Sequence, residues 1–427
     1  DRSVSRGLGD VYKRQVKKEE DIMKKFNKFL SVAVASAMVM AMAGCGNTDN
    51  GSAATGTNAA TESAAASDSA ASGSVFKIGG IGPTTGGAAV YGLAVQHGAE
   101  IAVEEINAAG GINGYQVEFK FQDDEADAEK SVNAYNALKD WGAQIIDGST
   151  TSGACIAVTD KTKEDNMFQI TPSGSAVECV QYDNNFRVCF SNPNQGLASA
   201  QYIGENGLAE KIAVIYDSSD VYSSGIYEKF AKEAENQPFE IVAAEAFTAD
   251  NKTDFSVQLQ KAKDAGADMV FLPIYYQESA LILTQAAAMG YAPKWFSCDG
   301  MDGILGGVDN FDVSLTEGVM LLTPFAADAT DDLTQSFVTK YKEKYGDTPN
   351  QFAADSYDAI YVIKAAIEKS GVTPDMSVSD ICDGMKAAMT EITVDGLTGN
   401  GMTWTADGEA NKAPKAVVIE NGAYKAM

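Results

Sequence analysis

From residue 75 onward, short apolar runs typical of strands alternate with longer segments that have the spacing of helices. The first run is "VFKIGGIG", and the segment after it, "LAVQHGAEIAVEEINAAGGING", carries apolar residues at helical spacing. The same order recurs with "YQVEFKFQDD", "AQIIDGST" and "MFQITPSGS", and again with "KIAVIYDSSD", "FEIVAAEAF", "ADMVFLPIYY" and "KWFSCDG". Strands that alternate with helices form parallel sheets covered on both faces. The pattern therefore predicts an α/β fold.

These strand–helix units are too many for one sheet of ordinary size, so we expect two Rossmann-like lobes. The chain is expected to leave the first lobe at Ser191–Asn194 and to return near Thr323–Pro324. In open α/β sheets, ligands bind beyond the carboxyl ends of the strands. The loops at those ends repeat small hydroxyl residues, glycines and tyrosines, and they are the place to look for a site.

The first of these loops, in "KIGGIGPTTGGAAVYG", invites comparison with a dinucleotide-binding loop. Gly80 and Gly82 match the first two glycines of G-x-G-x-x-G, but Thr85 occupies the third position. Pro83 also removes a backbone N–H at the point where a pyrophosphate would need one. The sequence does not support a nucleotide site.

Two neighbouring strand ends carry serines, and a third carries a carboxylate. Ser152, Ser173 and Ser175 stand where strands give way to helices, and helix N-termini with hydroxyls can bind a carboxylate without a basic residue. The alternative is ordinary helix N-capping, which would explain any one of the three serines. Asp299 directly ends a predicted strand and is either a ligand contact or a cap.

The sequence gives little support for catalysis or for a metal. His97 is the sole histidine, it lies within the first helical pattern, and no G-x-S-x-G motif accompanies it. We expect it to be a solvated or capping helix residue. The acidic run that starts at Asp123, "DDEADAE", lacks the glycine and glutamate of a calcium loop. We therefore expect no enzyme activity, no metal and no cofactor.

The net charge and the cysteine spacing argue against further kinds of partner and site. The chain has 32 basic and 59 acidic residues, for a net charge of -27, which argues against nucleic acid as a partner. Five cysteines lie in the body, none in a C-x-x-C pair, which argues against a zinc or redox site. Either Cys155 and Cys179 form a disulfide or the cysteines are buried free thiols.

The N-terminal segments predict export and anchoring. "MKKFNKFLSVAVASAMVMAMAGC" begins at Met23 and has the basic, apolar and small-residue order of a signal peptide, which we place at residues 23–44. Its end resembles a bacterial lipobox, in which Cys45 would receive diacylglycerol; the alternative is an ordinary signal peptide with an incidental cysteine. Residues 1–22 resemble spurious upstream translation and are set aside. Residues 45–74 are small and polar, as in a flexible tether.

From about Val75 to the C-terminus, the chain resembles the bacterial leucine/isoleucine/valine-binding proteins, type I periplasmic binding proteins of ABC importers. The resemblance rests on the order and spacing of "KIGGIGPTTGGAAVYG", "INAAGGINGYQVE", "FQDDEAD", "TPSGSA", "FRVCFSNPNQG", "TEGVM" and "AADSYDA". It implies a hinge of three crossings, the third near Leu397–Met402. The implied N-terminal lobe is residues 75–192 with 324–400, and the implied C-terminal lobe is residues 193–323 with 401–427.

The resemblance also implies roles for individual residues. The ligand carboxylate would lie on Ser152, Ser173 and Ser175, and Asp299 would pair with the ligand ammonium where the family often has Glu. The remaining implied contacts are Tyr222 and Tyr275 from the second lobe, with Tyr91, Thr150, Thr151 and Phe352 around the ligand side chain. The two threonines and the shorter acid depart from the family pattern, and they favour a small or polar side chain over leucine.

The expected function is capture of an amino acid outside the cytoplasm, by lobe closure, for delivery to a membrane permease of an ABC importer. The protein would be held at the membrane by its lipid anchor. Two alternatives stay open: a sensory module that signals to a receptor, and a binder of a short amide or urea-type solute. An enzyme is a third class, against which the lack of a nucleophile–base pair argues.

Overall fold

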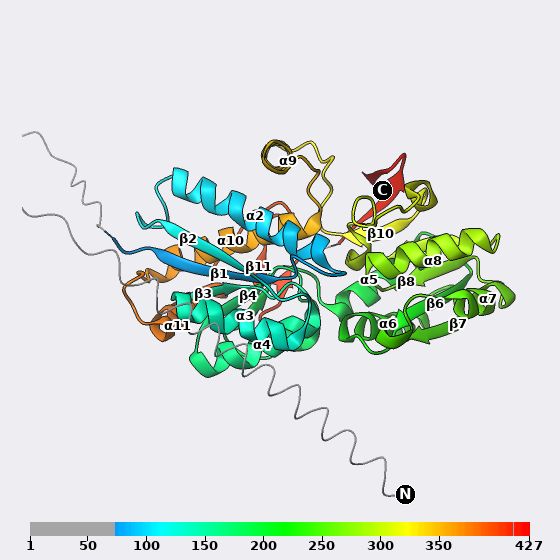
Figure 1. Cartoon of the computed structure of the whole chain (residues 1–427), viewed down its shortest axis with the longest axis horizontal. Coiled ribbons are helices and arrows are strands. Elements are labelled where there is room, and N and C mark those ends of the chain that lie inside the picture. The colour runs from blue at the N-terminus through cyan, green and yellow to red at the C-terminus, as the bar shows by residue number, and fades with distance from the viewer. Residues whose placement is uncertain (1–72, 413) are drawn as a thin grey trace, which may run out of the picture. The chain divides into compact units, whose positions relative to one another are not determined.

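The computed structural model describes residues 73–412 and 414–427, and these form two α/β lobes (Figure 1). The predicted extension at 1–22, the signal peptide at 23–44, the lipidation residue Cys45 and nearly all of the 45–74 tether lie outside the described residues. Within the described ranges, no helix has both the length and the apolar character needed to cross a membrane.

The first lobe is built on a five-stranded parallel sheet with strand order β2-β1-β3-β4-β5. The strands are β1 (Phe76–Gly82), β2 (Val117–Asp123), β3 (Ile145–Asp147), β4 (Phe168–Thr171) and β5 (Asn185–Arg187). In this register Ile78 of β1 lies beside Phe119 and Ile145. All carboxyl ends of the parallel strands therefore meet at one edge, as the strand–helix pattern predicts.

Helices cover both faces of this sheet (Figure 1). They are α2 (Ala89–Ala108), α3 (Ala128–Trp141), α4 (Ser152–Asp165), α10 (Gln351–Ser370) and α11 (Val378–Met389), whereas α9 (Asp332–Tyr345) packs on α2. The α2 and α10 helices pack on one face, and α3 and α4 on the other. Gly98 of α2 allows a close crossing, because a Cβ at this position would stand 2.0 Å from the Ala353 carbonyl oxygen of α10.

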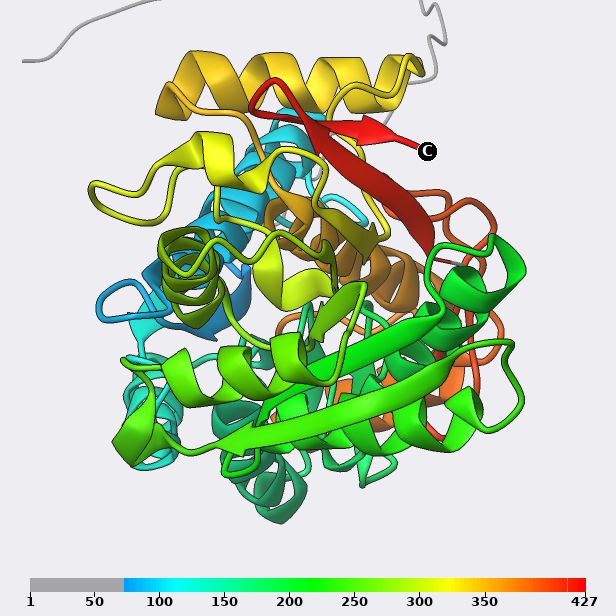
Figure 2. The same ribbon diagram turned by 90° about the vertical axis from the view of Figure 1, so that its right-hand side faces the viewer.

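The second lobe has a seven-stranded sheet with strand order β14-β13-β10-β9-β8-β6-β7 (Figure 2). Its strands are β6 (Lys211–Asp217), β7 (Glu240–Phe247), β8 (Met269–Leu272), β9 (Lys294–Ser297), β10 (Met320–Thr323), β13 (Lys415–Glu420) and β14 (Ala423–Ala426). The β13 strand pairs antiparallel with both β10 and β14, and the other neighbouring strands pair parallel. The covering helices are α5 (Asn192–Glu205), α6 (Val221–Ala234), α7 (Ser256–Asp264) and α8 (Tyr276–Ala288).

The chain passes between the two sheets three times. It crosses between β5 and α5, then between β10 and α9, and finally before β13. A small hairpin of β11 (Thr403–Trp404) and β12 (Ala410–Asn411) precedes the last crossing.

This hairpin corrects the predicted third crossing near residues 397–402 and the assignment of residues 401–412 to the second lobe. The buried Trp404 indole donates to the Arg187 carbonyl at 2.8 Å, and the Arg187 N–H donates to the Gly408 carbonyl at 3.0 Å. Since Arg187 ends β5, these bonds hold the hairpin beside the first sheet. The crossing therefore lies after Asn411.

Candidate ligand-binding site

A small cavity between the two lobes collects nearly all the residues predicted for the site. Its volume is about 10 Å³, and its wall consists of Tyr91, Thr150, Thr151, Ser152, Ser173, Tyr222, Tyr275, Asp299, Gly300 and Phe352. Of the predicted site residues, Ser175 alone is absent from this wall. Its backbone N–H donates to Ser152 Oγ at 3.1 Å, which places it directly behind the wall.

The first-lobe side of the cavity is the N-terminus of α4. Thr151 is the N-cap, yet its hydroxyl makes no capping bond, and Thr151 Oγ1 is buried without a hydrogen-bond partner. The first turn of α4 also contains no acidic side chain. A 14-residue helix presents free N–H groups and a partial positive charge at such an end. This end is therefore suited to a carboxylate.

The serines form a connected layer beneath that helix end. Ser152 Oγ accepts the N–H groups of Ser175 at 3.1 Å and Ala176 at 3.2 Å, and it lies 3.5 Å from Ser175 Oγ. Ser173 Oγ donates to the Thr150 carbonyl at 2.5 Å. The hydroxyls thus join the two predicted strand ends to each other, which simple N-capping of separate helices would not do.

Arg187, which the sequence analysis missed, binds the backbone at Ser175 and Ala176 on the side away from the cavity. It is fully buried, and its guanidinium donates to the carbonyls of Ser175 at 2.7 Å and Ala176 at 2.8 Å. Glu409 lies 3.4 Å from its Nε. Because Glu409 pairs with this guanidinium, the role of Arg187 here is to fix the backbone at Ser175 and Ala176. The clue in the sequence is the single basic residue in the otherwise apolar run "FRVCF".

Asp299 forms the opposite end of the cavity, from the second lobe. Its Oδ1 accepts the Tyr222 hydroxyl at 2.6 Å, and its Oδ2 accepts Gln195 Nε2 at 2.8 Å. The carboxylate is therefore held by side chains of α5 and α6 rather than serving only as a helix cap. Gln195 and Gly300, whose N–H donates to the Tyr222 hydroxyl at 2.8 Å, were not among the predicted residues.

Burial raises the pKa of Asp299 to about 7, although the bonds from Tyr222 and Gln195 offset part of the effect. Asp299 takes part in none of the ion pairs found among residues 73–412 and 414–427. The nearby Asp355, which pairs with Lys412 at 2.8 Å, raises the pKa of Asp299 further. The site therefore offers a carboxylate that lacks a cation.

Aromatic rings close the cavity and join the lobes. The Tyr91 hydroxyl donates to the Gly300 carbonyl and accepts the Tyr276 N–H at 3.2 Å, so α2 of the first lobe bonds both to Gly300 and to the first residue of α8 in the second lobe. The Tyr91 ring lies 4.5 Å from the ring of Phe352, and Tyr222 stacks on Tyr275 at 5.0 Å. The three predicted tyrosines therefore line one cavity wall together.

Two other sequence expectations have an outcome in the structure. His97 is half-buried rather than fully solvated: its ring stacks on Tyr345 at 3.6 Å, and its Nδ1 lies 3.2 Å from the Tyr341 hydroxyl. Burial lowers its pKa. Cys155 and Cys179 are neighbours in one buried cluster but are free thiols, as are the three other cysteines of the described residues. Both side chains fill the space under the serine layer.

Comparisons with known proteins place the chain in a family. The profile of the family described as periplasmic binding protein matches residues 75–423. The chain is 30% identical to the Leu/Ile/Val-binding protein homolog 3 of Brucella melitensis over 70% of this chain and 80% of that protein. It is also 30% identical to the leucine-, isoleucine-, valine-, threonine-, and alanine-binding protein of Pseudomonas aeruginosa, over 69% of this chain and 78% of the relative.

Solved structures share the fold. The substrate-binding protein LivJ of the branched-chain amino acid transporter of Streptococcus pneumoniae, in complex with isoleucine, superposes with a TM-score of 0.74. It is 28% identical, and the match covers 83% of this chain and 99% of LivJ. The leucine-binding protein LivK of Thermotoga maritima gives a TM-score of 0.73 at 27% identity, over 83% of this chain and 98% of LivK.

Proposed function

The chain belongs to the periplasmic binding protein family, and from this premise we propose that it is the amino-acid-binding component of an ABC importer. Proteins of this family bind solutes outside the cytoplasm and are not enzymes. The relatives named above bind leucine, isoleucine or valine, and one of them also threonine and alanine, according to their names. The specific ligand and the role of each residue in this chain are part of the proposal.

The observation that carries the proposal is the opposite chemistry of the two ends of the cavity. The first lobe contributes a helix N-terminus with Ser152 beside it, and the second contributes Asp299. An α-amino acid has a carboxylate and an ammonium on one carbon atom, so it can bond to both ends at once. Such a ligand lies between the lobes, and its binding therefore favours the closed form over the open form.

The wall around the ligand side chain favours a small or polar amino acid. Thr150 and Thr151 line the cavity, and Thr151 Oγ1 has no partner. A buried hydroxyl without a hydrogen bond costs about 1–3 kcal/mol, so a leucine side chain would leave that cost in place. A threonine or alanine ligand leaves room for a hydrogen-bonding group or a water molecule. The name of the Pseudomonas relative includes both of these amino acids.

Calorimetry with matched ligands tests this function. Alanine, threonine, valine and leucine should each be compared with the analogue that lacks the amino group and the analogue that lacks the carboxyl group. We expect at least one amino acid to bind and both of its analogues to bind far more weakly, because each leaves one end of the cavity unpaired. Binding of the carboxylic acid as tightly as the parent amino acid would contradict the proposed pairing with Asp299.

We also propose that Cys45 is lipidated and that the protein is held at the outer surface of the cytoplasmic membrane. The support is the lipobox-like sequence before Cys45 and the polar segment after it. Expression of the chain and of Cys45→Ala in a bacterial host, followed by fractionation, separates the outcomes. The parent chain should sediment with membranes, and the variant should be released. A parent chain that is fully released would contradict anchoring.

A further inference from the structure

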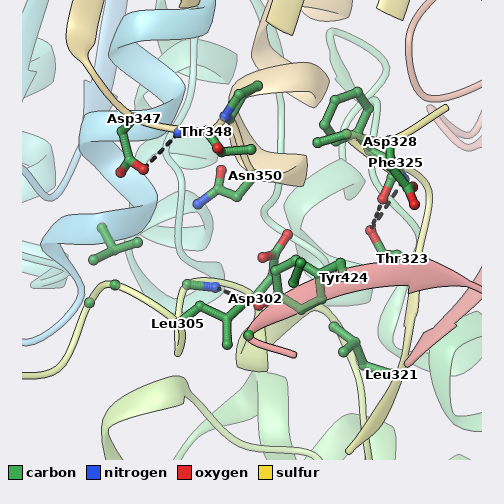
Figure 3. Close-up of a pocket in the computed structure, with 18 of the residues that line it drawn as sticks. Asp302, Leu305, Leu321, Thr323, Phe325, Asp328, Asp347, Thr348, Asn350 and Tyr424 are labelled. Atoms are coloured by element: carbon green, nitrogen blue, oxygen red, sulfur yellow. Dashed lines mark hydrogen bonds between the residues drawn. The ribbon is translucent and has the colours of Figure 1, made fainter. Parts of the chain in front are cut away.

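A second cavity, larger than the cavity at Asp299, lies beside the β10–α9 crossing (Figure 3). Its volume is about 480 Å³, which falls within the range of about 300–1,000 Å³ found for small-molecule sites. Segments 90–91, 300–303 and 350–352 each contribute residues to both cavities. The two cavities are therefore neighbours, lined by different residues of the same segments. We name the larger one the Asp302 cavity.

The walls of the Asp302 cavity are apolar on several sides, and the charged residues Asp302, Asp328, Asp347, Lys342 and Lys425 also line it, with Lys342 and Asp347 exposed at its rim. Leu305, Leu321 and Phe325 contribute apolar surface, and Pro349 and Ala423 add to it. Asp328 also lines the cavity, but it lies 3.7 Å from Lys425 Nζ and is thus paired. These walls suit a ligand with an apolar body.

Asp302 is the buried carboxyl group of this cavity. Its side chain is 5% exposed, and it lies beside Tyr424 and below Asn350 in Figure 3. The Oδ2 atom accepts the Gln351 N–H at 2.9 Å, whereas Oδ1 has no partner with hydrogen-bonding geometry. Burial raises the pKa of this carboxyl to about 6, although the Gln351 amide and the nearby Tyr424 hydroxyl oppose the rise. A cation would restore the charged form.

The chemistry favours an organic cation over a metal ion. No group of three or more His, Cys, Asp or Glu side chains that could hold a metal occurs among the residues that the structure describes. One carboxylate oxygen beside apolar walls is instead the arrangement that pairs with an ammonium group on an apolar body. We propose that the Asp302 cavity binds a small organic amine, whose ammonium pairs with Asp302 and whose apolar part contacts Leu305, Leu321 and Phe325.

The position of the cavity gives such an amine an effect on the site between the lobes. Pro349 and Asn350, just before α10, belong to the first lobe, whereas Asp302, Leu305 and Tyr424 belong to the second. An amine that contacts both lobes stabilises one angle between them, and so it changes the affinity of the cavity at Asp299. This coupling rests on the proposed function, whereas binding of the amine does not.

Calorimetry on the full chain with pentylamine and its neutral isostere pentanol tests the proposal. Pentylamine should bind, and pentanol should not, because Asp302 requires a cation. Asp302→Asn should weaken pentylamine binding by about tenfold or more, the size expected when a partly buried charge pair loses one member. Leu305→Trp fills the cavity and leaves Asp302 unchanged, and it should abolish pentylamine binding. This second variant still tests the proposal if Asp302→Asn does not fold.

Asp299→Asn is the matched control, since it removes a buried carboxyl from the neighbouring cavity. It should leave pentylamine affinity unchanged. Absence of pentylamine binding to the parent chain would overturn the proposal. The proposal would also be overturned if Asp299→Asn lost pentylamine binding while Asp302→Asn and Leu305→Trp both kept it. If pentylamine binds through Asp302 but no amino acid binds, the second site stands and the proposed function fails.

Discussion

At the scale of single residues, Asp299 is a carboxylate whose partners are all neutral. A phenol and an amide hold its two oxygens, and burial keeps the pKa of the group near 7, far above its ordinary value of 3.8. Two neutral donors orient a carboxylate without neutralising it. A ligand ammonium would supply the missing positive charge, and this is the reason to assign it to Asp299 rather than to another acid of the chain.

The raised pKa predicts that amino acid affinity depends on pH. Below about pH 7 Asp299 is protonated in the free protein, and the proton must leave before the ammonium can pair with a carboxylate. Affinity should therefore fall by up to about tenfold for each pH unit below that value, and level off above it. Calorimetric titrations from about pH 5.5 to about pH 8.5 measure the profile. An affinity that does not change over this range would contradict ammonium pairing at Asp299.

At the scale of helices and strands, the fold depends on close crossings such as that of α2 and α10. Gly98 faces the Ala353 carbonyl, and the backbone of α10 cannot move aside as a flexible side chain would. The two helices carry Tyr91 and Phe352, whose rings meet in the wall of the ligand cavity. Their separation therefore sets both the packing of the first lobe and the shape of the site.

Gly98→Ala should destabilise the protein even though alanine is the better helix former. The added methyl group would overlap the Ala353 carbonyl, and overpacking of this kind costs about 1–3 kcal/mol of unfolding free energy. Gly153→Ala in α4 is the control, because nothing lies within 4 Å of its Cβ position. That variant should be neutral or more stable by up to about 1 kcal/mol. Denaturant unfolding of both variants compares them, and equal stability would contradict the packing argument.

The sequence predicted the strand-end residues of the site because the carboxyl ends of parallel strands share one edge. That rule brought Ser152 and Ser173 into one cavity from local patterns alone. The rule says nothing of contacts made far along the chain. Gln195 reaches Asp299 across 104 positions, and as a polar residue of an ordinary helix it has no local signature.

Other features could not be predicted from the sequence for a similar reason. The hairpin of β11 and β12 has only two residues in each strand, too few to show an alternating pattern. The bond from the Trp404 indole to the Arg187 carbonyl decides where it lies, and this partner is 217 positions away. The partial burial of His97 has no local signature either, because α9, whose Tyr345 stacks on it, follows much later in the chain.

At the scale of the whole molecule, two lobes meet around the cavity and three crossings connect them. Short crossings allow rigid lobes to rotate while a few backbone angles change. The bonds of the Tyr91 hydroxyl to Gly300 and Tyr276 link the lobes directly, so they must break when the lobes separate. Ligand binding and these bonds should therefore act together in favour of the closed form.

Small-angle scattering should show a smaller radius of gyration at saturating amino acid than without it. Tyr91→Phe keeps the ring but removes both bonds of the hydroxyl, so it should favour the open form and weaken ligand affinity. A loss of about 1–3 kcal/mol, or about fivefold to a hundredfold, is the expected size for two buried hydrogen bonds. A radius that does not change with ligand would contradict capture by closure.

The most direct test of the account is the affinity of Asp299→Asn for the amino acid that the parent chain binds most tightly. Asparagine keeps the size of Asp299 and one of its two acceptor oxygens but removes its charge, so folding should be preserved while the ammonium loses its partner. Asp302→Asn removes a buried carboxyl from the same loop but outside this cavity, and it serves as the control.

Calorimetry should show a loss of about thirtyfold to several thousandfold in Asp299→Asn, which corresponds to about 2–5 kcal/mol for a buried pair that loses one member. The affinity of Asp302→Asn should stay much closer to that of the parent chain. Parent-like affinity in Asp299→Asn would contradict the central claim that this cavity recognises an amino acid through its ammonium group.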